Sequence, residues 1–143
     1  MLLRYSKLIS FLLILFFSST LYAEDILIIH QNYGNTHSKH KNRLENAGHT
    51  VTMQNTSSSY SYTAANYDQV YDIRYSYTSY STADIDRFKT VLSNGGTVYL
   101  VGENGNFDSR NDAIVSFLQE VTGDNNIAHS GNSCCGSGAK YSM

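Results

Sequence analysis

Ionisable side chains follow three of the four strands that the sequence predicts. His30 ends the first apolar run and Asp72 ends the third, while Glu103 comes just after the fourth. The carboxyl ends of parallel strands open into one crevice, where α/β proteins commonly hold their ligands. Two carboxylates and an imidazole brought together there would suit acid–base hydrolysis. Glu103, Asp72 and His30 are therefore the candidate catalytic residues.

The same edge of the predicted sheet would gather further polar groups, which are candidates for ligand binding. They are Gln31, Asn32, Tyr33, Gly34, Asn35, Thr36, Arg74, Asn104, Arg110 and Asn111. A simpler interpretation is that loops are polar in any protein. Arg74 or Arg110 would then pair with Asp72 or Glu103 only to close the structure. The sequence leaves both interpretations open.

Histidines raise the question of a metal site. His37 and His40 lie three residues apart on a predicted helix, and His30 lies just upstream. A zinc ion needs a third or fourth ligand in fixed geometry, for which Asp72 or Glu103 would be the nearby choices. Solvent-exposed histidines on a helix explain the pair more simply, so we expect no metal site.

The elements that must position these groups alternate along the chain. Strands are expected at 25–30, 50–53, 67–74 and 97–101, and helices at 36–47, 81–94 and 108–123, with a loop at 55–65. Such alternation requires parallel strands joined by right-handed crossovers. We therefore predict an α/β fold that resembles a flavodoxin-like three-layer sandwich, with a sheet of about four strands in the order 2-1-3-4.

The residue patterns at the two ends of the chain differ from those of the middle. Arg4 and Lys7 precede an apolar run and then small residues up to Ala23, which is the pattern of a secretory signal peptide over residues 1–23. The predicted domain covers residues 24–124. Residues 125–143 are expected to form a flexible or truncated tail, in which only Asn126 to His129 could offer a short fifth strand.

Charge and export limit the partners. Removal of residues 1–23 leaves 8 basic and 12 acidic side chains, a net charge of −4. A mildly acidic surface gives no support for binding nucleic acid. We expect a secreted or periplasmic protein with no stable membrane anchor after signal cleavage.

Three segments together resemble the class I glutamine amidotransferase-like superfamily, in particular ThuA-like and related secreted domains. They are Tyr67 to Ile73, the helix from Phe88 to Gly96, and Thr97 to Val101. Catalytic members of the superfamily carry a Gly-x-Cys-x-Gly turn after the fourth strand. Here Val101 to Gly105 is aligned with that turn, and Glu103 occupies the position of the cysteine. A carboxylate cannot act as the thiolate does, so the resemblance implies the fold without the amidotransferase reaction.

A second, shorter resemblance concerns the first loop. Gly34, Asn35 and Thr36 match the phosphate loop of flavodoxins, which holds the FMN phosphate at a helix N-terminus. Gln31 and Tyr33 replace the hydroxyl residues of that loop. We expect no cofactor, and FMN is the alternative.

Seven tyrosines lie between Tyr60 and Tyr80. Tyrosine rings can stack on sugars or fill a protein interface, or their bodies can lie half-buried over the sheet. We expect an exported, non-catalytic binding or interaction module, for a glycan or a cell-surface protein. The alternatives are a hydrolase that uses Glu103 and Asp72, or an FMN protein.

Overall fold

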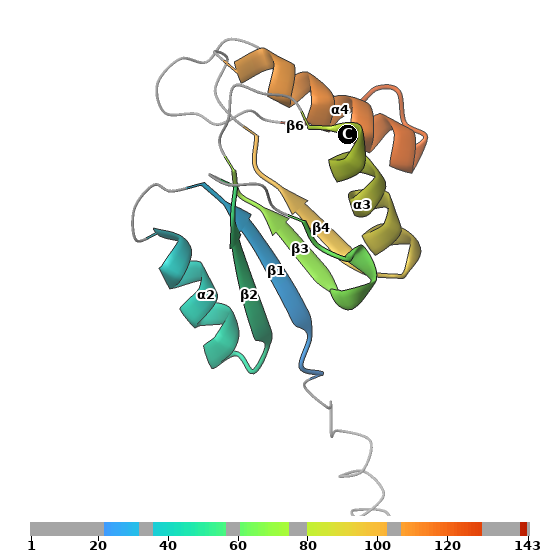
Figure 1. Ribbon diagram of the computed structural model, residues 1–143. Coiled ribbons are helices and arrows are strands. Elements are labelled where there is room, and N and C mark those ends of the chain that lie inside the picture. The colour runs from blue at the N-terminus through green and yellow to red at the C-terminus, as the bar shows by residue number, and fades with distance from the viewer. Residues whose placement is uncertain are drawn as a thin grey trace, which may run out of the picture.

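The computed structural model describes residues 22–31, 36–56, 61–74, 80–102, 107–129 and 141–142. Its elements in chain order are β1 (Asp25–His30), α2 (Thr36–Asn46), β2 (Thr50–Asn55), the 3-10 turn η1 (Ala64–Asn66), β3 (Gln69–Asp72), α3 (Thr82–Ser93), β4 (Thr97–Leu100), α4 (Asp108–Thr122), β5 (Ala128–His129) and β6 (Tyr141–Ser142). The predicted fold class is confirmed: four parallel strands form one sheet in the order β2-β1-β3-β4, flanked by helices (Figure 1).

Some predicted boundaries differ from the observed ones. β2 runs on to Asn55, because it stays in register with the whole of β1 up to the pair His30 and Asn55. The expected loop at 55–65 contains the start of η1. β3 is shorter than predicted and covers only Gln69–Asp72.

β1 is the centre of the sheet and is covered on both faces. Its four aliphatic residues, Ile26 to Ile29, are at most 1% exposed. The crossovers β1–α2–β2 and β3–α3–β4 run in opposite directions along the sheet, so right-handed connections place α2 and α3 on opposite faces. Both sets of alternating side chains in β1 therefore meet a hydrophobic layer, which explains its unbroken apolar run.

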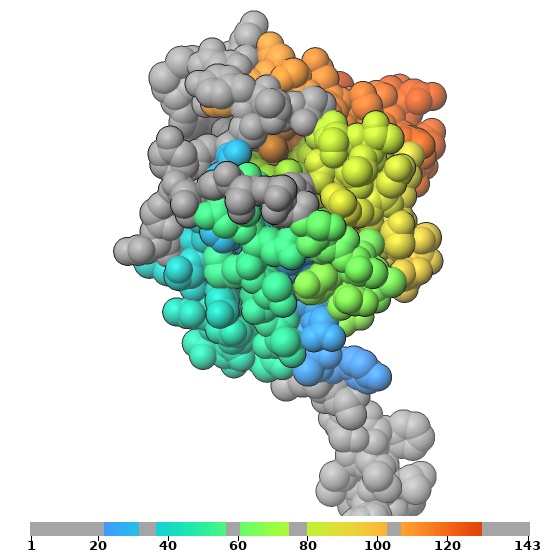
Figure 2. Space-filling view, viewed as in Figure 1, coloured from blue at the N-terminus to red at the C-terminus, as the bar shows by residue number. Residues whose placement is uncertain are grey.

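The larger part of the core lies between the sheet and α3. It consists of Leu27, Ile29, Tyr62, Ala64, Val70, Phe88, Val91 and Phe117. Phe88 is its centre: its ring meets Tyr80 edge-on at 5.4 Å and Phe117 at 5.8 Å between centroids. Figure 2, which views the molecule from the same side as Figure 1, shows side chains near η1 and α3 covering the sheet on this face.

Residues at its two ends determine where α3 begins and ends. Ser81 caps the helix by accepting a hydrogen bond from the amide of Asp84, and the Asp84 carboxylate accepts from the amide of Ser81. This reciprocal capping box is the one that the sequence predicts. At the other end Gly96 is required by space, since a Cβ there would lie 2.6 Å from the carbonyl oxygen of Asp68. The capping box thus fixes the start of α3, and the turn after the helix passes close to Asp68, just before β3.

The short strand expected near Asn126 to His129 exists but does not join the main sheet. β5 pairs antiparallel with β6, in register Ala128 with Ser142 and His129 with Tyr141. The predicted signal peptide lies outside the described residues, apart from Tyr22 and Ala23. None of the helices in the described ranges combines the length and apolar character that a bilayer-spanning segment needs.

We predict that Phe88→Ala lowers the free energy of unfolding by about 3–5 kcal/mol, because the substitution leaves a cavity where three aromatic rings meet. Urea unfolding measures the change. Val121→Ala is the control, since Val121 is 40% exposed on α4 and should cost less than about 0.5 kcal/mol. Equal losses in the two variants would contradict the central role of Phe88.

Candidate functional site

The carboxyl edge of the sheet, where the sequence places the site, is occupied by a buried ion cluster. Asp72 at the end of β3 is fully buried, and the Arg74 side chain forks around it. Arg74 Nε lies 2.9 Å from both carboxylate oxygens, Nη2 donates to Oδ2, and the Arg74 amide donates to Oδ1 at 3.1 Å. This paired, bidentate geometry is the strong form of a charge-assisted hydrogen bond.

A second arginine reaches the same carboxylate from α4. Arg110 is 1% exposed, and its Nη2 lies 3.5 Å from Asp72 Oδ1 and donates to the Tyr80 hydroxyl at 2.9 Å. Its Nε donates to the carbonyl oxygen of Val101 at 3.3 Å. The guanidinium carbon of Arg110 also lies 4.8 Å from the centroid of the Tyr80 ring, in cation–π contact.

Asp84 completes the cluster from the first turn of α3. Its Oδ2 lies 3.7 Å from Arg74 Nη2, and its Oδ1 lies 3.7 Å from Arg87 Nη1. Two acids and two buried arginines are therefore in contact with one another, and the partly exposed Arg87 adds a third cation at Asp84. The interpretation that Arg74 and Arg110 pair with Asp72 to close the structure agrees with this geometry, and Asp72 has no exposed surface from which to act on a substrate.

The other predicted site residues are distributed as follows. Glu103, Asn104 and residues 32–35 lie outside the described residues. Gln31 and His30 are half-buried at the end of β1, and Thr36 begins α2. Asn111 is 1% exposed on α4, so it lies within the protein rather than in a crevice.

Of the three histidines considered for a metal site, His30 and His37 are neighbours. Their ring centroids are 5.1 Å apart, with a tilt of 39°. Burial, and then the nearby His30, lower the pKa of His37 below its ordinary value of 6.5. Across the described ranges, no three His, Cys, Asp or Glu side chains are grouped so that they could share a metal ion.

One ion pair, between His129 and Asp112, could not be predicted from the sequence. His129 Nε2 lies 2.9 Å from Asp112 Oδ1, which joins β5 to the first turns of α4. No local spacing rule relates two residues that lie seventeen positions apart in a strand and a helix. Only the return of the chain after α4 brings them together.

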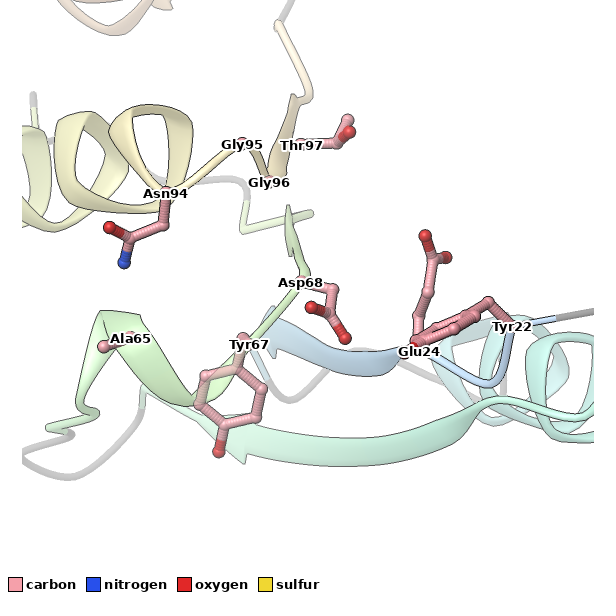
Figure 3. Close-up of a pocket in the computed structure, with 9 residues that line it drawn as sticks. All are labelled: Tyr22, Glu24, Ala65, Tyr67, Asp68, Asn94, Gly95, Gly96 and Thr97. Atoms are coloured by element: carbon pink, nitrogen blue, oxygen red, sulfur yellow. The ribbon is translucent and has the colours of Figure 1, made fainter.

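The described residues also surround a pocket at the opposite, amino-terminal edge of the sheet (Figure 3). Its volume is about 540 Å³. It is lined by Tyr22, Glu24, Ala65, Tyr67, Asp68, Asn94, Gly95, Gly96 and Thr97. These residues come from the starts of three strands, from η1 and from the end of α3, so the pocket forms only when the sheet is assembled.

Two carboxylates line this pocket. Asp68 Oδ2 accepts the amide of Asp25 at 2.8 Å, and Glu24 Oε2 accepts the side-chain amide of Gln69. Among the described residues, neither the second oxygen of Asp68 nor that of Glu24 has a hydrogen-bond partner in the chain. In Figure 3 the Asp68 carboxylate extends toward Glu24. Each acid is therefore held through one oxygen, and the same oxygen of Glu24 also lies 3.6 Å from His49 Nδ1.

Comparison with protein-family models, with curated proteins and with solved structures gives no match for this chain. The resemblance to the amidotransferase-like superfamily therefore stays a prediction from the sequence.

We predict that Asp72→Asn lowers the free energy of unfolding by about 3–5 kcal/mol, because it leaves two arginines buried without their carboxylate. Chemical denaturation checks this value. The matched control is Lys89→Met, which removes an exposed ion pair with Glu120 and should cost less than about 1 kcal/mol. An Asp72→Asn loss as small as that of the control would mean that the cluster adds little to the fold.

The lowered pKa of His37 predicts a pH-dependent stability. The unfolded chain binds this proton at a higher pH than the folded protein does, so stability should fall as pH drops below about 7. The fall should end once the pH is below the folded-state pKa. In His37→Gln this component disappears, and unfolding midpoints measured from about pH 7 to pH 5 should decline less steeply. Parallel curves for the two proteins would contradict the assignment.

Proposed function

We propose that this domain is a non-catalytic binding module that takes a ligand with an organic cation, such as an amine or a guanidinium, into the amino-edge pocket. The observation that carries the proposal is the wall of the pocket: two carboxylates face it, and none of its nine lining residues is basic. A cationic group would supply the charge that the wall lacks, and the free oxygen of each acid would accept its hydrogen bonds.

The end of α3 supports the same chemistry. The helix terminates at the pocket, where Asn94 is the C-cap and Gly95 follows. The C-terminal end of a helix carries a partial negative charge, which favours cations nearby. The last turn of α3 has no basic residue to compensate it.

The size and composition of the pocket fit a small ligand or one side chain of a larger partner. A volume of about 540 Å³ lies in the range of ordinary ligand pockets. Tyr67 supplies an aromatic ring in the wall, which could contact the cation through its face. Tyr22 precedes the predicted cleavage point, so the other eight lining residues would form the pocket of the exported domain.

The described tyrosines give less support to a sugar platform in the tyrosine-rich segment. Tyr62 is 8% exposed within the core, and burial raises the pKa of its phenol above the ordinary value. Tyr80 is held between Phe88 and the two arginines of the ion cluster. Tyr75 and Tyr77 lie outside the described residues, so a glycan or surface protein as partner stays a prediction for that part of the chain.

Calorimetric titration with agmatine and with spermidine tests the proposal. Binding should be detectable at low salt and should weaken as salt is added, because the attraction is electrostatic. Asp68→Asn and Glu24→Gln should each weaken binding about tenfold, the effect of losing about 1.4 kcal/mol. Both substitutions keep an oxygen that can accept the existing bond from Asp25 or Gln69.

Glu120→Gln is the matched control, because it removes the same charge from an exposed position on α4 away from the pocket. Its affinity should equal that of the wild type. If neither cation binds, or if all three variants weaken binding equally, the proposal fails. Binding of a neutral oligosaccharide without binding of either cation would favour the glycan interpretation instead.

A further inference from the structure

β4 is an edge of the sheet. It pairs with β3 on one side, and in the described part of the chain no strand lies on its other side. β5, which follows it, pairs with β6 in a separate sheet. The outer edge of β4 therefore presents backbone donors and acceptors without a strand to receive them.

The register shows which groups point outward. The amides of Thr97 and Val101 donate to carbonyl oxygens of the β3 segment, at 2.9 Å and 3.2 Å. Backbone groups alternate in direction along a strand, so Tyr99 also points toward β3. The amide and carbonyl groups of Val98 and Leu100 must then point away from the sheet.

The strand carries none of the features that usually protect such an edge. Thr97, Val98, Tyr99 and Leu100 include no charged residue and no proline. Monomeric proteins commonly place lysine, proline or a bulge on an exposed edge to prevent pairing with another chain. β4 is instead suited to receive a strand.

An aromatic pair lies on the sheet face beside this edge, on the side opposite α3. Tyr99 is 53% exposed, and its ring centroid lies 5.3 Å from that of Tyr71 on β3, with a tilt of 34°. α2 is on the same face but packs at β2, on the far side of β1. The two rings are thus left at the open end of this face.

We propose that β4 pairs with β4 of a second copy of this chain, antiparallel, about a two-fold axis that passes beside Tyr99. In this register Val98 of one copy lies opposite Leu100 of the other, and the outward amide and carbonyl groups of these residues bond across the axis. The two Tyr99 residues form the close, non-hydrogen-bonded pair of an antiparallel ladder. Their rings join the two Tyr71 rings in one aromatic row, and cross-strand aromatic pairs stabilise sheets.

A second copy is the occupant that the chemistry of the edge favours. A two-fold axis places each side chain against its own kind, which a charged edge would resist by like-charge repulsion. β4 is neutral throughout, so nothing in the strand opposes self-pairing. β2, the other edge, exposes Thr50 and Thr52 and no aromatic ring, and it serves as an internal control.

Amide hydrogen exchange on the wild-type protein is the first test. Exchange of Val98 and Leu100 should slow as the concentration is raised, because dimerisation covers their amides. The outward amides of β2, at Val51 and Met53, should exchange at a rate independent of concentration. If Val98 and Leu100 show no dependence on concentration, or if the β2 amides show the same one, the proposal is overturned.

Molar mass in solution is the second test. Analytical ultracentrifugation at about 100 µM should show a dimer for the wild type and a monomer for Tyr99→Lys, which places two like charges across the axis. Thr52→Lys, the same charge on the other edge strand, should remain dimeric. A monomeric wild type, a dimeric Tyr99→Lys, or the loss of the dimer in both variants would each exclude pairing through β4. Should Tyr99→Lys fail to fold, the exchange measurement on the wild type decides.

Discussion

The fully buried carboxylate of Asp72 is the constraint on which the packing of α3 and α4 on the sheet depends. Asp72 ends β3 inside the protein, and a buried charge is tolerated only where partners compensate it. Arg74 and Arg110 supply that compensation from the segment after β3 and from α4. Because Arg74 also contacts Asp84 on α3, one ion cluster joins the sheet to both helices on the same face.

Such a cluster has consequences for where a ligand could bind. The carboxyl edge is the usual place for a site in a parallel sheet, but here its described charges are satisfied by one another. The amino edge is different, since Glu24 and Asp68 line a pocket there and each uses one carboxylate oxygen to hold the backbone or a neighbouring side chain. The carboxyl edge therefore stabilises the fold, whereas the amino edge carries the pocket that we propose as the ligand site.

The strands of the sheet also differ in how completely they are covered. β1, at its centre, is covered on both faces. Among the described residues, β4 has no strand at its outer edge, and Tyr99 is exposed on the face opposite α3. Apolar and aromatic surface that would normally lie under another element is exposed at Tyr99. At the pocket and at the outer edge of β4, the described part of the domain does not fully bury its surface or pair its backbone groups.

Local sequence determines the elements of this protein. The unbroken aliphatic run of β1, the capping box at Ser81 and the alternation in β3 are decided by neighbouring residues, so the fold class was predictable. The strand order followed from the resemblance to a flavodoxin-like sandwich. Boundaries such as the end of β2 were less so, because pairing with β1 extends the strand beyond what its own residues indicate.

Tertiary structure alone decides which polar groups meet. The sequence predicts that Asp72 and Arg74 lie at one edge of the sheet. It does not show whether their charges face solvent or compensate each other, because that depends on Arg110, thirty-eight positions after Asp72. The pocket is assembled from three strand starts and one helix end, so no local pattern indicates it. Periodicity is a property of adjacent residues and is readable along the chain, whereas electrostatic compensation and cavities arise between segments that only folding brings into contact.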